Sequence, residues 1–294
     1  MISIIICSRN LGIDPKLSTN ITSTIGCEYE LIVIDNSQNK YSIFQAYNLG
    51  IKKSTSEIIC FVHEDVLFHS KDWGKKLIEI FKSDTKIGLV GVAGSKVKTK
   101  APSGWWNSPH ELKQINIIQH IETGEVERWE YGLDNDALLE EVVAIDGVFM
   151  VVKRDENILF DSTLKGFHNY DLNISLLYKV KGYKVMVTKE IVIEHFSNGN
   201  INKSWYLSTQ IFHDKNKHYL PLMTDDLKDN FDLKKLEFYN GVKFIYYSLN
   251  FGFNYNIVIK WFRLLLINPT DKTHKKIAKS IIKNLIKKIK IKVY

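Results

Sequence analysis

The chain has 294 residues, of which 45% are hydrophobic, 25% are charged and only 5 are proline, a composition typical of a soluble globular protein. Its three cysteines (Cys7, Cys27 and Cys60) show no paired spacing, which argues against a disulfide framework and favours a reducing compartment. The net charge of +7 arises at the C-terminal end, because residues 272–294 hold nine lysines and no acidic residue, leaving −2 for residues 1–271. The body of the chain therefore offers no basic groove for nucleic acid.

Neither a signal peptide nor a membrane span is expected. The apolar run at residues 2–6 is too short for a signal core and has no basic segment before it. No run reaches the roughly 18 apolar residues that a spanning helix needs. These features favour a cytoplasmic protein.

The N-terminal part of the chain alternates short apolar runs with helix-like segments. Continuous β-branched runs predict strands at residues 2–7, 31–34, 58–62 and 87–92. Apolar side chains at helical spacing predict helices at residues 15–25, 43–51 and 73–81. Strands and helices in this order indicate an α/β protein with a mostly parallel, Rossmann-like sheet, which binds its ligand at the carboxyl ends of the strands.

The rest of the chain is less regular. Residues 96–135 are expected to be loop-rich. Further elements are predicted as a strand at 142–152, a helix at 171–180 and strands at 184–187 and 191–195. Helices rich in Tyr, Phe and Leu follow residue 200, so we expect one unit at residues 1–200 and a helical unit at residues 201–294.

Three ionisable residues directly follow the predicted strand at 58–62. Side chains alternate along an extended chain, so His63 and Asp65 are expected on one side and Glu64 on the other. A carboxylate there could bind Mg²⁺ or Mn²⁺ together with phosphate oxygens. The alternative is an ordinary polar strand end at the surface.

Other polar residues are expected at the same sheet edge, namely Ser8, Arg9, Asp35 and Asn36. Asp35 could accept hydrogen bonds from a base or ribose, or it could cap the next helix. No glycine-rich dinucleotide fingerprint or P-loop occurs in the sequence, which counts against those two kinds of site.

Two residues further along the chain are also candidates. Asp171 opens a predicted helix, where it could be an N-terminal cap or a general base for a substrate hydroxyl. His195 ends a predicted strand and could bind a metal or a phosphate, or it could simply be a core or surface histidine.

Six segments in this order resemble the family 2 type of bacterial glycosyltransferase with a GT-A fold, over about residues 1–200. The segments are ISIIICSRN, YELIVIDNS, AYNLGIKKSTSEIICFVHEDV, IDGVFMVVKR, FHNYDLNISLLYKVKGYKV and EHFSNG. The resemblance implies a nucleoside-diphosphate-sugar donor, a divalent metal (Mn²⁺ or Mg²⁺) and inverting transfer to an acceptor hydroxyl. It also implies a role in bacterial cell-surface polysaccharide or glycan synthesis, with a glycan or lipid-linked glycan as the acceptor.

The resemblance further implies roles for single residues. His63, Glu64 and Asp65 stand at the D-x-D stretch that binds metal and diphosphate, with His63 in place of the first Asp. Asp171 matches the catalytic base, and Tyr170 replaces the acidic residue that often precedes it. The remaining matches are the nucleoside-binding Ser8, Arg9 and Asp35, the donor-pocket Asp146 and Gly147, and His195 at the metal or diphosphate.

Two other functions are open from the sequence. A nucleotidyltransferase on a related sheet would need a glycine-rich basic loop after the first strand, but CSRNLGIDPK has one glycine and no basic cluster. A non-catalytic carbohydrate- or nucleotide-binding protein on the same fold would suit the abundant Trp and Tyr and the replacements at His63 and Tyr170.

The C-terminal end is predicted to form a basic amphipathic helix. Ile277, Ile281, Leu285 and Ile289 recur at every fourth residue, and lysines fall largely on the other face. Such a helix can lie on an anionic membrane surface, which would suit a lipid-linked acceptor. The alternative is packing on the body of the protein or on a partner subunit in a homo-oligomer.

Overall fold

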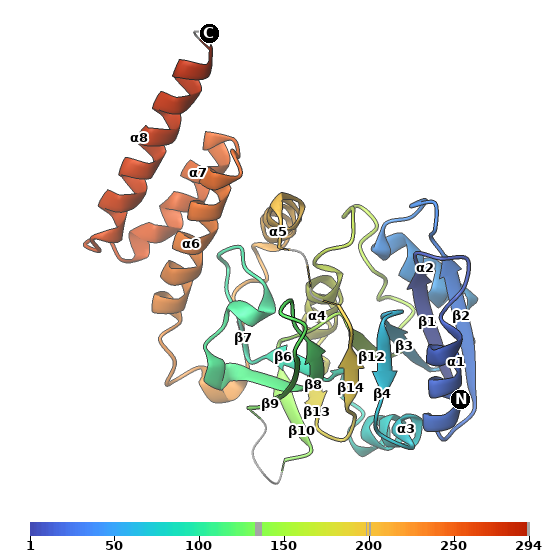
Figure 1. The fold of residues 1–294 in the computed structure, drawn as a ribbon. Helices are drawn as coiled ribbons and strands as arrows, with labels where there is room; N and C mark the ends of the chain where they lie inside the picture. Colours follow the sequence, from blue (N-terminus) through green and yellow to red (C-terminus); the bar gives the residue numbers. More distant parts are fainter. Residues whose placement is uncertain (133–136, 198, 200, 293–294) are drawn as a thin grey trace.

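The computed structural model describes residues 1–132, 137–197, 199 and 201–292 of the chain (Figure 1). Its main sheet has seven strands in the order β10-β13-β5-β12-β3-β1-β2. Their bounds are β1 (Ile2–Ser8), β2 (Tyr29–Asp35), β3 (Ile58–Val62), β5 (Ile87–Gly91), β10 (Leu139–Val142), β12 (Phe149–Lys153) and β13 (Lys184–Thr188).

The main sheet is mixed. β1 pairs in parallel with β2 and β3, and β5 with β13, as the alternation of strands and helices predicts. β12 runs antiparallel between β3 and β5, and β10 runs antiparallel to β13. Because β12 is reversed, its first residue, Phe149, pairs with Val62 at the end of β3. The turn just before β12 therefore lies at the edge where β1, β2 and β3 end.

The single strand predicted at residues 142–152 is wrong. The chain forms β10, the short β11 (Ala144–Ile145) and β12, with Asp146 and Gly147 in the connection between the last two. The side chains from Val142 to Val152 are nearly all buried, so the apolar run gives no sign of the break.

A second sheet has the order β11-β6-β8-β14-β4, with β9 paired to β8. Its other strands are β4 (Val66–Phe68), β6 (Ala93–Ser95), β8 (Lys113–His120), β9 (Val126–Tyr131) and β14 (Ile193–His195). The expectation of loops over residues 96–135 is therefore wrong for β8 and β9. In β8 polar and apolar residues do alternate from Gln114 to Ile117, but the sequence does not reveal that the amides Gln114, Asn116 and Gln119 are buried along with Ile115 and Ile117.

The helices of the first part are close to their predicted positions. They are α1 (Pro15–Thr24), α2 (Ile43–Lys53), α3 (Trp73–Ser83) and α4 (Tyr170–Val180). α2 begins with a capping box in which Ser42 and Gln45 bond to each other's backbone N–H groups. These helices pack against the strands and bury one apolar core (Figure 1).

The C-terminal part is helical, as predicted. It contains α5 (Lys203–Asn216), α6 (Leu233–Asn250), α7 (Tyr255–Phe262) and α8 (Thr273–Lys292), and α6, α7 and α8 form a group at one end of the molecule (Figure 1). This group has its own apolar cluster, which includes Trp205 of α5, whereas Phe212 of α5 belongs to the main core. The division at residue 200 stays a proposal. None of the described helices is long and apolar enough to cross a membrane.

Candidate active site

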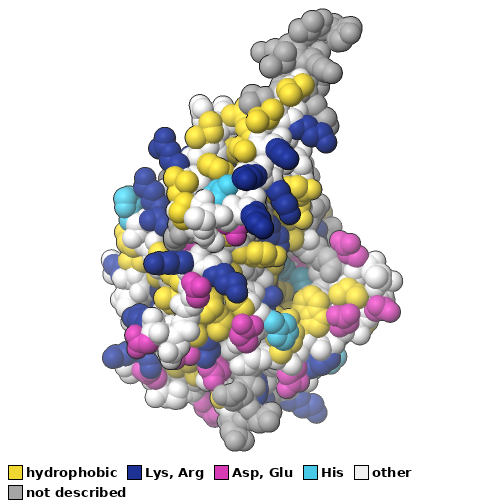
Figure 2. All heavy atoms as spheres, turned by 90° about the vertical axis from the view of Figure 1, so that its left-hand side faces the viewer, with side chains coloured by type: hydrophobic (Ala, Val, Ile, Leu, Met, Phe, Trp, Pro, Cys, Tyr) yellow, Lys and Arg dark blue, Asp and Glu magenta, His cyan; other side chains and the backbone are white. Residues whose placement is uncertain are grey.

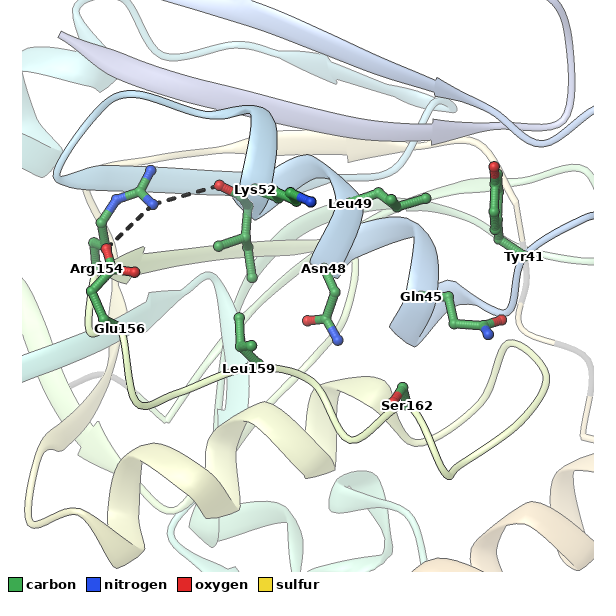
Figure 3. A pocket seen from close by; sticks show the side chains of 10 residues that line it. Tyr41, Gln45, Asn48, Leu49, Lys52, Arg154, Glu156, Leu159 and Ser162 are labelled. Atoms are coloured by element: carbon green, nitrogen blue, oxygen red, sulfur yellow. Dashed lines mark hydrogen bonds and ion pairs between the residues drawn. The ribbon is translucent and has the colours of Figure 1, made fainter.

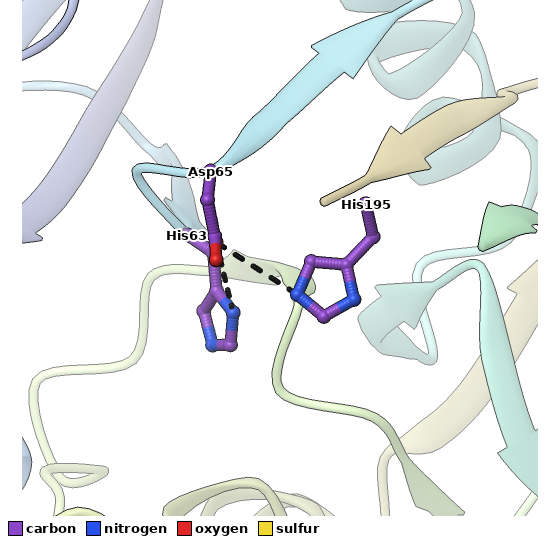
Figure 4. A group of neighbouring side chains, drawn as sticks. All are labelled: His63, Asp65 and His195. Atoms are coloured by element: carbon purple, nitrogen blue, oxygen red, sulfur yellow. Dashed lines mark ion pairs between the residues drawn. The ribbon is translucent and has the colours of Figure 1, made fainter. Parts of the chain in front are cut away.

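His63, Asp65 and His195 meet at the edge where β3 and β14 end. One ligand atom from each of the three lies within 4.8 Å of the others, and both rings face the Asp65 carboxylate (Figure 4). His63 Nδ1 and His195 Nε2 are each 3.7 Å from Asp65 Oδ1. The strand register explains the meeting, because His195 of β14 pairs with Val66, the residue after Asp65.

The electrostatics of this cluster suit a cation. Burial opposes ionisation of Asp65, but the Ser197 hydroxyl and the two histidines outweigh it and hold the pKa of Asp65 below its usual value. Burial and the neighbouring His63 lower the pKa of His195, which favours the neutral ring. Two imidazole nitrogens and a carboxylate oxygen are a donor set that divalent transition ions accept. The residues present therefore fit a divalent cation.

Glu64 points away from the cluster, as the alternation predicts. Its Oε2 accepts a hydrogen bond from the Ser8 hydroxyl at 2.6 Å, and its Oε1 is 2.7 Å from Arg9 Nε. The Ser8 hydroxyl is also 2.6 Å from the carbonyl of Gly12. Glu64 thus joins the ends of β1 and β3, while the Arg9 side chain is 76% exposed at the edge.

Asp35 and Asn36 lie at the end of β2. Asp35 is exposed and accepts the Ser37 N–H at 2.9 Å within the loop after β2, whereas the residue that caps the next helix, α2, is Ser42. The Asn36 amide is buried and engaged at both ends, because its Nδ2 donates to the Tyr41 carbonyl and its Oδ1 accepts the Tyr41 N–H, each at 2.9 Å. Asn36 fixes the loop before α2, and binding of a nucleoside by either residue stays a prediction.

Asp171 lies in the first turn of α4 and is 8% exposed. Its Oδ1 accepts the N–H of Leu172 at 2.8 Å. Burial and the nearby Asp146 raise the pKa of Asp171 to about 7, against smaller opposing effects of that N–H and of Lys98. A carboxylate with a pKa near the working pH is suited to general base catalysis.

Asp146 and Gly147 precede β12 at the same edge. Asp146 accepts the Val148 N–H with Oδ1 and the Trp105 indole N–H with Oδ2, both at 2.9 Å, so it anchors the short 3-10 helix η1 (Trp105–Asn107). Gly147 allows a close approach, because a Cβ there would be 2.3 Å from the Tyr170 hydroxyl oxygen. That hydroxyl is 2.5 Å from His63 Nε2. The close packing at Gly147 thus lets Tyr170, the first residue of α4, reach His63.

The sequence did not indicate the buried polar group next to α4. Lys98 Nζ, which is fully buried, bonds to the Thr99 carbonyl (3.2 Å), the Ser103 hydroxyl (2.7 Å) and His213 Nε2 (2.7 Å). His213 lies in α5, 115 residues further along the chain. Nothing local in the sequence pairs them. This group links the loop after β7 (Val97–Lys98) to α5.

A cavity lies away from this edge, between α2 and the segment that follows β12. It has a volume of about 680 Å³ and is lined by Tyr41, Gln45, Asn48, Leu49, Ile51, Lys52, Arg154, Glu156, Leu159 and Ser162 (Figure 3). The arginine in its wall, Arg154, donates hydrogen bonds to the carbonyls of Ser54 and Ser56, each at 2.9 Å, just beyond the end of α2. These bonds give Arg154 a structural role. None of the candidate site residues lines this cavity, so we assign the chemistry to the sheet edge.

Known proteins resemble this chain in family profile and in fold. The sequence profile of a glycosyltransferase-like family matches residues 3–220, well over half of the chain. No curated protein sequence matches the chain. The solved structures that resemble it include the following two. The crystal structure of GalNAc-T7 with UDP, GalNAc and Mn²⁺ has a TM-score of 0.51 and 12% identity, covering 88% of this chain and 54% of that one. The structure of S. aureus TarS 1–349 with UDP-GlcNAc has a TM-score of 0.49 and 10% identity, covering 85% and 73%.

The α/β sheet flanked by helices is that of the GT-A glycosyltransferases, which confirms the predicted fold class. The chain belongs to the glycosyltransferase-like family whose profile it matches. It spans about half the length of GalNAc-T7.

Proposed function

We propose that this protein is a metal-dependent, inverting glycosyltransferase that moves a sugar from a nucleoside-diphosphate sugar to an acceptor hydroxyl. The observation that carries the proposal is the cluster of His63, Asp65 and His195 at one sheet edge, tied through Tyr170 to the helix of Asp171. Membership of the glycosyltransferase-like family supports sugar transfer in general. The UDP and Mn²⁺ in the GalNAc-T7 structure agree with this choice of donor and metal.

The residues of the cluster would hold Mn²⁺ or Mg²⁺ through His63 Nδ1, Asp65 Oδ1 and His195 Nε2. A divalent ion bound there supplies positive charge against the diphosphate leaving group. Arg9, exposed beside Glu64, would add a second positive group on the donor side. Ser8 and Asp35, at the ends of β1 and β2, would face the nucleoside, and Asp146 and Gly147 the sugar.

Asp171 would act on the acceptor. Its carboxylate would take the proton of the attacking hydroxyl as the oxygen bonds to the anomeric carbon from the face opposite the diphosphate. That geometry inverts the configuration. Because the pKa of Asp171 is raised to about 7, the base would be strong enough to accept the proton near neutral pH.

The first test separates donor binding from transfer. We expect Asp171→Asn to lower the transfer rate by a factor of 10² to 10⁴, the usual contribution of a general base, while nucleoside diphosphate binding is kept. Calorimetry with a panel of nucleoside diphosphates, with and without Mn²⁺, measures that binding. Asp65→Ala should abolish the increase in nucleoside diphosphate binding that Mn²⁺ causes. Asp229→Ala, at an exposed loop position, serves as the control.

Either of two results would overturn parts of the proposal. Transfer at the wild-type rate by Asp171→Asn would remove that residue from the role of base. Failure of every nucleoside diphosphate to bind the wild-type protein would favour a non-catalytic binding protein.

The acceptor and the location of the reaction are part of the proposal. We place the reaction in the synthesis of a bacterial cell-surface polysaccharide, at the cytoplasmic face of the membrane. A lipid-linked acceptor would bring the protein to an anionic bilayer, and α8 carries features that support such contact. Its Ile282 and Ile286 are exposed, whereas Ile277 is buried against the C-terminal cluster.

Packing on the body thus accounts for one side of α8. The side chains of Leu285 and Ile289, which the sequence placed on the apolar face, lie outside the described residues.

A further inference from the structure

Gln119 binds the ring nitrogen of His195 that does not face Asp65. The Gln119 Nε2 donates to the carbonyls of His120 (2.7 Å) and Ser197 (2.9 Å), so its Oε1 is the atom that faces His195 Nδ1 at 3.0 Å. An amide oxygen only accepts hydrogen bonds, and therefore Nδ1 carries the proton. The lone pair of this ring is then on Nε2, the nitrogen that faces Asp65.

The position of Gln119 follows from strand register. β14 pairs in parallel with β8, and His195 is directly opposite Gln119 in that pair. Gln119 is 6% exposed, so its bonds compete little with water. Hydrogen bonds to the backbone carbonyls and to the ring hold the Gln119 amide in place, which leaves the His195 imidazole one orientation.

The histidine His63 is held in a similar way by Tyr170. Its Nε2 is 2.5 Å from the Tyr170 hydroxyl, and its Nδ1 faces Asp65 at 3.7 Å. When Nδ1 gives its lone pair to a cation, the ring proton must be on Nε2, and Tyr170 accepts it. Tyr170 is buried between Tyr47 and His63, and Gly147 leaves room for its hydroxyl.

We propose that Gln119 and Tyr170 are positioning residues for the metal, each holding one histidine in the tautomer whose free nitrogen faces Asp65. The inference rests on the proposed metal-dependent function. Tyr170 also begins α4 and directly precedes Asp171 in the chain, so it links His63 to the candidate base.

Binding of Mn²⁺ alone to the full-length protein tests the proposal, with free Mn²⁺ followed by electron paramagnetic resonance. We expect Tyr170→Phe to weaken Mn²⁺ binding by about 10- to 100-fold, the usual effect of losing the partner of a ligand histidine. Tyr178→Phe is the matched control. It removes a buried hydroxyl from the same helix, but that hydroxyl donates to the Lys153 carbonyl at 2.6 Å and not to the site.

Gln119 is tested by two substitutions. Gln119→Met removes all its bonds, and we expect the same 10- to 100-fold loss of Mn²⁺ affinity. Gln119→Glu loses the two bonds to backbone carbonyls but keeps an acceptor for His195 Nδ1, so Mn²⁺ affinity should remain within about threefold of the wild type. A residue needed only to hold the backbone would give equal losses in both variants.

The outcomes are distinguishable. If the wild-type protein fails to bind Mn²⁺, both the metal-dependent function and this inference are overturned. If it binds Mn²⁺ and the Tyr170→Phe and Gln119→Met variants bind equally well, only the positioning role is overturned. Circular dichroism and thermal melting of each variant establish that it is folded during the measurement.

Discussion

Two buried ionisable side chains next to the candidate site have pKa values displaced toward neutrality. Burial lowers the pKa of Lys98 to about 7, against the attraction of Glu237 and Asp171. Burial and the charge of Asp146 raise the pKa of Asp171 to about 7. In each case the protein interior disfavours the charged form. Lys98 is compensated by three acceptors, whereas the Asp171 carboxylate accepts the backbone N–H of Leu172.

The two groups should affect stability in different pH ranges. Between about pH 4 and 7 the unfolded chain has lost the proton of Asp171 and the folded chain keeps it, so the free energy of unfolding falls as the pH rises. Between about pH 7 and 10.5 the unfolded chain keeps the proton of Lys98 and the folded chain has lost it, so the free energy of unfolding rises. Each slope is at most about 1.4 kcal/mol per pH unit.

Urea denaturation at a series of pH values, compared between wild type and variant, measures these contributions. Asp171→Asn should remove the fall below pH 7, and Lys98→Met should remove the rise above it. A difference from wild type that stays constant across the whole pH range would show that the group titrates alike in the folded and unfolded chain.

The sequence predicts some of these residues and not others, for a physical reason. His63, Glu64 and Asp65 could be placed because strand alternation is a local rule, and the structure puts Glu64 opposite the other two. Gln119 could not, since its partner His195 is 76 residues away and the pairing depends on the register of β8 and β14. The same holds for Lys98 and His213.

At the scale of elements, Arg154 connects the end of β12 to the end of α2. Its guanidinium donates to the carbonyls of Ser54 and Ser56 and to the Ser54 hydroxyl. These acceptors lie just beyond the last residue of α2. A cation at a helix C-terminus also interacts favourably with the helix dipole. Arg154 is therefore assigned a structural role, although it lines the cavity next to α2.

We expect Arg154→Met to lower the free energy of unfolding by about 2 kcal/mol or more, because charged hydrogen bonds to partly buried carbonyls are lost. Urea denaturation measures the change. Lys52→Met, at an exposed position lining the same cavity, should cost less than about 1 kcal/mol. Equal losses in the two variants would contradict the assignment.

Element prediction succeeded where an apolar run or a helical periodicity is bounded by polar residues, and failed where an apolar run hides a break or where the buried side chains are polar. The continuous apolar runs of β1 and β3 and the capped, periodic α2 follow from the sequence. The break between β11 and β12 does not, because residues on both sides of it are buried. β8 was missed because its buried amides bond to backbone carbonyls, as Asn116 does with Lys189 and Ile191, and so appear polar in the sequence.

At the scale of the whole molecule, charge is segregated. Residues 238–292 hold twelve lysines and arginines and a single acidic residue, Asp271. Figure 2 shows dark-blue Lys and Arg side chains interspersed with yellow apolar ones over the upper, C-terminal part, with acidic side chains gathered below. This pattern fits a surface that approaches an anionic bilayer.

We expect the full-length protein to sediment with phosphatidylserine vesicles at low salt and to be released as salt rises. The Ile282→Ser, Ile286→Ser double variant should bind the vesicles at least tenfold more weakly, because it removes exposed apolar contacts from α8. Ile211→Ser, at an exposed position on α5, is the control. Vesicle binding unaffected by the double variant, or a dimer that this variant dissociates, would assign the pair to another partner.

Helix α5 belongs to both apolar clusters, and this affects the order in which the protein is completed during synthesis. The three residues of the cation cluster have all been synthesised once His195 is added, because the chain is made from its N-terminal end. The Asn169 side chain, just before the helix of Asp171, can form its hydrogen bond with Thr209 only after Thr209 has been synthesised. The hydrogen bond between Lys98 and His213 can form only later still. The candidate metal ligands of a nascent chain are therefore all synthesised before the surroundings of the candidate base, Asp171, are complete.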